Sequence, residues 1–399
     1  MKRSVFLALA VCLVTLAFPV CTWAQSARHV AMANTGIAAF NPGGYAPILE
    51  NVATATTAPN YSVLWESHLA MLLSKTDAYE YSETDGGDSS SGGEEWSKSK
   101  LNVLGSAALS AATFLVPLTQ KGQNEMGGRV ALFGYLGYLS EIEYSEQDFE
   151  DVDRKTTVLH QAGGPALRFG VAYGFTDMVS LGGAVNYQHL GRQSEFEDDN
   201  NDADQKTKME PELEGFKIED YEIGLLFQPV AEFQIGTRFN FGDHAYVEGD
   251  SVTVKVNGDN VGEAAYSAVY SVPAGFGLGF AYFDEAEWSL AFDLQRTMHD
   301  QYKFMEYPEK TEISLGFEKG FSQKYKIRAG IGKIDEADAV DYSPSHLTRF
   351  DIGGGFRFAN VVVLDLALGL IMGDSEPQDD LETTRTAGFE TALTIGGNF

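Results

Sequence analysis

Most of the chain beyond its first 60 residues consists of segments in which apolar and polar residues alternate. In one such segment Phe350 and Phe356 lie on one face, while Asp351 and Arg357 lie on the other. Alternation with a period of two is typical of a β-strand that has one apolar and one polar face. About fourteen segments of this kind follow one another along the chain, centred near residues 68, 108, 135, 166, 186, 221, 237, 274, 293, 314, 329, 352, 367 and 391.

The polar breaks between these segments alternate between short ones, such as FANV, and long acidic ones, such as GDSEPQDDLETT. Short turns on one side and long polar loops on the other are typical of transmembrane β-barrels. A soluble β-sandwich also alternates, but its strands average about five or six residues, shorter than the roughly ten residues of a tilted membrane strand. Several segments here are long enough for a membrane, so we predict an all-β fold. Residues 60–399 are expected to form a transmembrane antiparallel β-barrel of about 14 strands.

The final segment, RTAGFETALTIGGNF, ends on an aromatic residue. Phe389, Leu393, Ile395 and Phe399 share one face of it. An even number of antiparallel strands returns the C-terminus to the side of the short turns. A last strand that ends on an aromatic residue is typical of the signal by which the barrel-assembly machinery recognises outer-membrane barrels. We therefore predict that Phe399 belongs to an insertion signal.

Residues 1–24 have the layout of a cleaved secretory signal peptide. Lys2 and Arg3 precede an apolar run, and small residues favour cleavage between Ala24 and Gln25. An uncleaved membrane anchor is the alternative, although the run is short for a spanning helix. Export predicts that the mature protein lies in the cell outer membrane, in contact with its lipid and lipopolysaccharide.

Composition and charge exclude several classes of protein. The two cysteines, Cys12 and Cys21, both lie in the predicted signal peptide, which excludes disulfides and cysteine chemistry in the mature chain. The formal net charge of -29 repels nucleic acid. No long apolar run follows the signal peptide, which argues against a helical membrane protein.

Residues 25–59 precede the first alternating segment and show no clear alternation. They are rich in small residues, and Arg28 and Glu50 are their only full charges. A flexible periplasmic tail is one interpretation, but disordered segments favour a more charged composition. We therefore predict that residues 25–59 form a plug, or hatch, inside the barrel lumen.

Several passages resemble the FadL/TodX family of outer-membrane transporters for long-chain fatty acids and other hydrophobic compounds. SARHVAMANTGIAAF, followed by Asn41, Pro42 and Gly43, resembles the hatch of that family and its Asn-Pro-Ala element. The passages GLLFQPVAEFQIGTRFNF and YSVPAGFGLGFAYFDEAEWSLAFDLQRT are also similar to family passages. The resemblance implies fourteen strands, a hatch, and hydrophobic ligands such as fatty acids or aromatic hydrocarbons. It also implies a third strand that kinks against the hatch and opens a lateral gap into the membrane.

The third segment, MGGRVALFGYLGYLSEIEY, carries apolar residues on both faces. Gly134 and Gly137 lie within it, and glycines inside a strand commonly mark bulges or close backbone approach. They fit a kink at the lateral gap and join Asn41, Pro42 and Gly43 as predicted gating residues. The alternative is a strand that is covered on both faces, by lipid on one and by the plug on the other.

Arginines on the polar faces of the segments are candidates for binding an acidic ligand, because a guanidinium pairs with a carboxylate through two hydrogen bonds. The candidates are Arg168, Arg238, Arg328 and Arg357. The alternative is that they balance acidic residues in ion-pair networks that brace the barrel and the plug.

No arrangement of residues indicates an enzyme, a cofactor or a metal site. The seven histidines are scattered, and the pair His299 and Asp300 is more typical of a solvated loop than of a catalytic rim. Asp198, Asn200, Asp202 and Asp204 alternate as calcium ligands do, but the glutamate and glycine of a calcium loop are missing. A solvated acidic loop is therefore the favoured interpretation.

Two classes of function stay open. One is a monomeric transporter that binds hydrophobic compounds in its lumen and releases them sideways into the membrane. The other is a general porin or a secretion or surface scaffold barrel. The predicted hatch and the unusual third segment favour the transporter, since an open porin needs neither.

Overall fold

The computed structural model describes residues 27–35, 37–38, 51–57, 61–81, 95–119, 127–149, 154–200, 205–209, 212–284, 288–298, 300–302, 305–307, 309–322, 324–337, 344–358, 362–375 and 382–398. Several predictions lie outside these residues: the signal peptide, the gating residues Asn41, Pro42 and Gly43, the residues His299, Asp202 and Asp204, and the insertion signal at Phe399.

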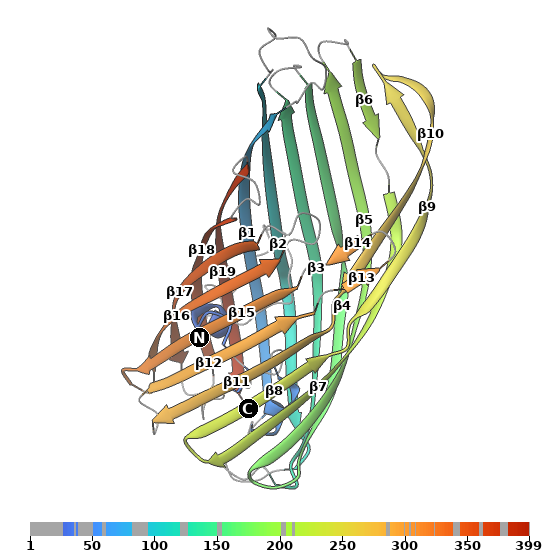
Figure 1. The fold of residues 1–399 in the computed structure, drawn as a ribbon. Coiled ribbons are helices and arrows are strands. Elements are labelled where there is room, and N and C mark those ends of the chain that lie inside the picture. The colour runs from blue at the N-terminus through green and yellow to red at the C-terminus, as the bar shows by residue number, and fades with distance from the viewer. Residues whose placement is uncertain are drawn as a thin grey trace, which may run out of the picture.

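Fourteen antiparallel strands close into a barrel (Figure 1), which confirms the predicted fold and strand number. The last strand pairs with the first, with Ser62 opposite Asn398, so the ring is complete. A closed ring satisfies the backbone hydrogen bonds of every strand within a membrane. In order around the ring the strands are β1 (Ser62–Tyr81), β2 (Glu95–Pro117), β3 (Val130–Phe149), β4 (Arg154–Gly174), β5 (Val179–Asn200), β7 (Glu212–Val230), β8 (Phe233–Asn240), β11 (Gly275–Asp284), β12 (Trp288–Thr297), β15 (Lys310–Gly320), β16 (Tyr325–Ala337), β17 (Pro344–Phe358), β18 (Val362–Ser375) and β19 (Glu382–Asn398).

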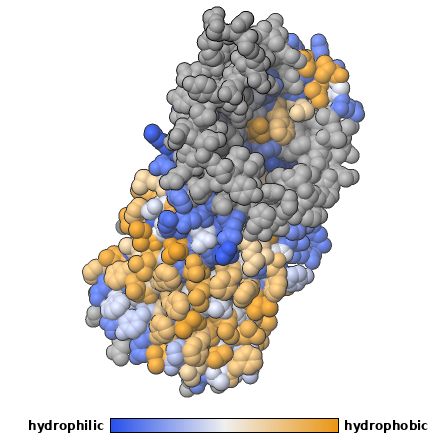
Figure 2. Space-filling model, viewed as in Figure 1, coloured by the Kyte–Doolittle hydropathy of each residue, from blue (hydrophilic) through white to orange (hydrophobic). Residues whose placement is uncertain are grey.

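The barrel is apolar on its outside and polar on its inside, the reverse of a soluble protein. On β18 the outward-facing Leu366, Leu368 and Leu370 are 56%, 58% and 57% exposed, whereas the inward-facing Asp365 and Ala367 are 1% and 4% exposed. Figure 2 shows apolar residues gathered over the lower half of the visible face. Apolar residues that face outward at every second position are what a lipid-embedded barrel requires.

The wall of the barrel has two heights (Figure 1). β1 to β5 and β7 contain 19 to 23 residues, whereas β8, β11, β12 and β15 contain 8 to 11. A tilted strand needs only about 9–11 residues to cross a membrane. The tall strands therefore extend beyond the lipid on the side of the long loops.

Two further strands continue the short wall upward as an arm. β9 (Asp243–Val256) follows β8 after a break at Gly242, and β10 (Asp259–Val272) leads into β11. The turn between them places Asn257 and Gly258 at φ values of 50° and 88°, as a tight hairpin turn requires. The arm reaches the tall wall through β6 (Gln205–Met209), which pairs with both β5 and β9. The predicted segment centred near residue 274 thus lies where β10 meets β11, and the other predicted centres fall within barrel strands.

The third strand differs from the expected kink. β3 pairs with β4 without interruption from Val130 to Phe149, and its residues alternate regularly between the two faces. Its ladder with β2 has a register shift between Leu109 and Ala112, opposite Gly137. The irregularity therefore lies in β2. β3 itself is regular, as the alternative interpretation of a strand covered on both faces expects. Inside the lumen, the N-terminal residues Val52 and Ala55 cover the apolar inner face of β3.

Among the described N-terminal residues, two short helices are present: α2 (Ala27–Ala31) and the 3₁₀ helix η1 (Val52–Thr57). No helix among the described residues is long and apolar enough to cross a membrane.

Candidate functional site: the barrel interior and the N-terminal segments

Residues 28–38 and 51–57, here called the N-terminal segments, are buried wherever the structure describes their side chains. Their contacts follow the order of the strands around the inner wall. Residues 31 to 38 touch glycines of β17, β16, β15, β11 and β8 in turn, and residues 51 to 53 touch glycines of β7 and β5. The glycines of this seat are Gly353, Gly330, Gly316, Gly279, Gly277, Gly236, Gly224 and Gly182. The segments therefore line the lumen over most of its circumference.

The seat needs glycine because the backbone of the N-terminal segments approaches the wall closely. A Cβ atom added to Gly182 would lie 2.7 Å from the carbonyl carbon of Val52 and 2.8 Å from the backbone nitrogen of Ala53. Such distances are too short for real contacts, so any side chain here would displace η1. On the neighbouring Gly183 an added Cβ atom would come no closer than 3.7 Å to other atoms.

Hydrogen bonds also tie the N-terminal segments to the wall. The backbone N–H of Ile37 donates to Asp293 on β12 at 2.9 Å. The Asn51 amide donates to the carbonyl oxygens of Ile37, at 2.8 Å, and Leu225, at 3.1 Å, so it joins both segments to β7. The bonds to Ile37 satisfy backbone groups that have no strand partner, as buried backbone requires.

Two more bonds hold η1 in place. The Ser180 hydroxyl donates to the carbonyl oxygen of Ala53 at 3.0 Å, and the Arg129 guanidinium donates to that of Thr56 at 2.7 Å. The carbonyl of Thr56 lies at the C-terminal end of η1, where carbonyl groups need such donors.

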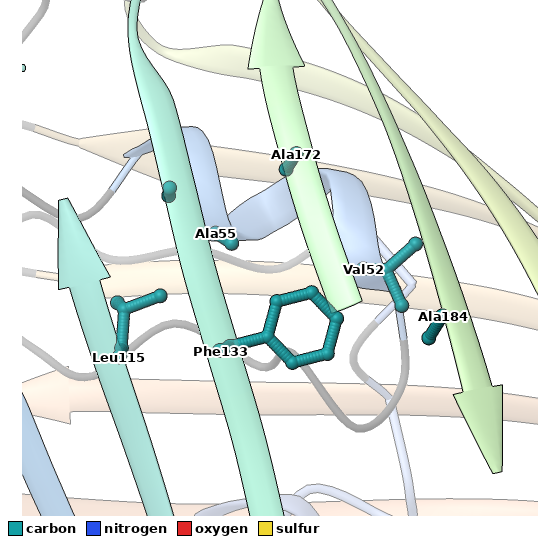
Figure 3. Packing of buried hydrophobic residues seen from close by; sticks show 7 residues of the cluster. Val52, Ala55, Leu115, Phe133, Ala172 and Ala184 are labelled. Atoms are coloured by element: carbon teal, nitrogen blue, oxygen red, sulfur yellow. The ribbon is translucent and has the colours of Figure 1, made fainter. Parts of the chain in front are cut away.

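An apolar cluster seats η1 against the tall wall. Figure 3 shows Val52 and Ala55 beside Leu115 on β2, Phe133 on β3 and Ala172 on β4. All five side chains are at most 3% exposed. This contact explains why β3 is apolar on both faces: lipid covers one and η1 covers the other.

A buried cluster of charges anchors the beginning of the N-terminal segments. Arg28 donates to Glu318 on β15 at 3.2 Å, and Arg328 donates to the same carboxylate at 2.7 Å. Arg328 also donates to Asp365 at 2.7 Å, and Lys326 donates to Glu318 at 2.8 Å. Glu318, which is 1% exposed, thus binds three cations, and breaking a buried ion pair is costly.

Three of the four predicted ligand-binding arginines, Arg168, Arg238 and Arg328, pair with carboxylates on the inner wall. Arg168 donates to Glu222 at 2.9 Å, and Arg238 lies 3.6 Å from the same carboxylate. Arg328 belongs to the Glu318 cluster, whereas Arg357 lies apart near the short turns, where its backbone N–H donates to Lys324. This arrangement matches the ion-pair networks of the alternative interpretation, and the prediction that these arginines bind ligand stays open.

A second charge network on the inner wall was missed by the sequence reasoning. His68 on β1 contacts Glu390 on β19, which also pairs with Arg349 on β17. Arg349 in turn donates to Asp351 at 2.7 Å. The alternating pattern places these residues on the polar faces of their strands. However, the sequence near each residue does not indicate which charges pair across strands.

The described residues include no group of three or more histidine, cysteine and acidic side chains that could hold a metal ion. Asp198 lies near the upper end of β5, and Asp300 begins the short strand β13 (Asp300–Tyr302).

These features define a class of protein: a closed transmembrane barrel whose N-terminal segments pack against its inner wall. A FadL homologue of Pseudomonas aeruginosa shares the fold with a TM-score of 0.65 at 12% identity, over 96% of this chain and 100% of the other. The toluene transporter TodX of P. putida aligns with a TM-score of 0.58 at 14% identity, over 94% of this chain and 98% of the other. The toluene transporter TbuX of Ralstonia pickettii aligns with a TM-score of 0.54 at 13% identity, over 94% and 98%. The resemblance to the FadL/TodX family is therefore confirmed at the level of the fold. No protein-family model and no curated sequence matches the chain.

Proposed function

We propose that the protein carries hydrophobic compounds across the outer membrane. The observation that carries this proposal is the packing of the N-terminal segments around the inner wall of a closed barrel. A porin that conducts water and ions needs an unobstructed lumen, and these segments narrow it with buried apolar side chains and paired charges. We further propose that residues 25–59 act together as a hatch.

The proposed ligands are the compounds named for the solved structures of similar fold, monoaromatic hydrocarbons such as toluene, together with long-chain fatty acids. Burial of an acyl chain gains about 0.8 kcal/mol per methylene group, so such ligands bind without a specific polar contact. A carboxylate would have to compete with Glu222 for Arg168 and Arg238. This competition favours uncharged ligands over acids.

Sideways release into the membrane suits such ligands, because an apolar molecule gains nothing by entering water. We place the proposed exit beside Gly137, where the ladder between β2 and β3 shifts register. A bulge leaves a residue unpaired and disrupts the ladder locally, which makes this the weakest part of the pairing around β3.

Uptake of radiolabelled toluene tests the proposed function. A strain that lacks this protein should take up toluene several-fold more slowly than the same strain carrying it, and glucose uptake should be equal in both. Restored uptake of small polar solutes with no change for toluene would favour the porin alternative.

Blocking the proposed exit tests the sideways route. The double substitution Gly134→Val with Gly137→Val should slow toluene uptake several-fold, because added Cβ atoms would meet the rings of Phe114 and Tyr135. Gly183→Val, at an open position on β5, is the matched control. Normal uptake by a folded double variant would contradict an exit at this place.

A further inference from the structure

The upper end of β12 lies beside a strand edge that lacks a partner. β11 and β12 pair as far as Gly275 opposite Thr297, and the backbone N–H of Met298 donates to the carbonyl oxygen of Ala274 at 2.9 Å. Beyond this point β12 ends, while the chain of β11 continues upward as β10. Within the described residues β10 pairs with β9 alone, so its edge on the side of β12 is open. An open edge is a template for another strand.

The chain that leaves β12 soon forms a separate hairpin. β13 pairs with β14 (Met305–Tyr307) through three residue pairs, from Asp300 opposite Tyr307 to Tyr302 opposite Met305. This two-stranded sheet is separate from the barrel sheet. The residues of β13 therefore belong to this hairpin, whereas in a longer β12 they would continue that strand.

The register between β11 and β12 determines where that backbone would pair. Each step upward along β12 moves one residue back along β10, so Asp300 comes opposite Val272 and Tyr302 comes opposite Tyr270. We propose that β13 exchanges partners, leaving β14 and adding to the open edge of β10 as an in-register extension of β12. The protein then has two states of its rim, one with β13 in the hairpin and one with β13 in the wall.

The two states are close in backbone bonding. The exchange breaks three residue pairs between β13 and β14 and forms three between β13 and β10. When two states are nearly balanced, a ligand that contacts one of them better shifts their populations.

The exchange alters access to the lumen from the side of the long loops. In the hairpin state the rim above β12 and β15 is the low side of the barrel (Figure 1). In the wall state β13 raises the rim next to the arm of β9 and β10. If the protein carries hydrophobic compounds as proposed, the wall state restricts their approach to the lumen from this side.

Pairs of cysteines test the exchange, because the mature chain contains no other cysteine. The in-register pairs are Val272→Cys with Asp300→Cys, and Tyr270→Cys with Tyr302→Cys. The matched control, Val272→Cys with Tyr302→Cys, is two residues out of register, which adds about 7 Å along the strand. A disulfide needs Cβ atoms about 3.5–4.5 Å apart. Heat-modifiable migration in gels first establishes that each variant is folded.

Under mild oxidation we expect both in-register pairs to cross-link at least tenfold faster than the control. Cross-linked protein should take up radiolabelled toluene several-fold more slowly, with recovery after dithiothreitol. Equal cross-linking of all three pairs, or none in folded protein, would overturn the exchange. Fast in-register cross-linking in a protein whose parent carries no toluene would support the exchange and refute the transport proposal alone.

Discussion

Replacement of Glu318 by alanine is expected to destabilise the barrel by about 3–5 kcal/mol, the usual cost of breaking a buried ion pair. Glu318 is 1% exposed and pairs with Arg28, Lys326 and Arg328. Its removal leaves these cations without their shared carboxylate, and two of them, Arg28 and Arg328, are buried. Equilibrium unfolding in lipid vesicles, followed by tryptophan fluorescence, measures the loss.

The matched control is Asp335→Ala, which removes an exposed carboxylate that pairs with Lys333 at 2.8 Å. Exposed ion pairs contribute about 0–1 kcal/mol, so this change should have little effect. Arg28→Ala separates the two roles of the cluster, because it removes the N-terminal partner and leaves the strand partners. Similar unfolding free energies for Glu318→Ala and Asp335→Ala would contradict the anchoring role.

Gly182→Val is expected to unseat η1 and open the lumen. The added side chain would overlap the backbone of Val52 and Ala53, so η1 must move away from β5. The expected results are a several-fold rise in single-channel conductance in planar bilayers and protease cleavage within residues 51–57. Deletion of residues 25–57 should raise the conductance further.

Gly183→Val is the control for this substitution, since it places the same side chain one residue away, where an added Cβ atom has free space. It should leave conductance unchanged. If Gly182→Val and the deletion both conduct like the parent, the N-terminal segments do not obstruct the lumen and the hatch hypothesis is wrong.

The barrel itself could be predicted because its pattern is local. A strand that crosses a membrane must alternate between lipid and lumen, and this requirement shows directly in stretches such as Leu364 and Leu366 on either side of Asp365. The arm of β9 and β10 could not be predicted in the same way. Its strands also alternate, and only the break at Gly242 and the pairing with β6 place it above the barrel.

The sequence predicted which charged residues face the interior, but not which of them pair with one another. Arg168 and Arg328 were predicted to lie on the polar faces of their strands, and both face inward. Their partners were not predictable: Arg28 meets Glu318 from 290 positions away, a distance over which sequence spacing carries no information. The third strand was ambiguous for a related reason, because an apolar inner face does not reveal whether a kink or η1 explains it.

The sequence by itself determined the fold class, the number of strands and which residues face the lipid, because these follow from a period of two in each segment. The tertiary structure alone decided which charges pair inside the lumen and which of the chain's 42 glycines form the seat of the N-terminal segments. The physical reason is that strand alternation is set within a few residues, whereas contacts across the lumen join residues that only closure of the barrel brings together.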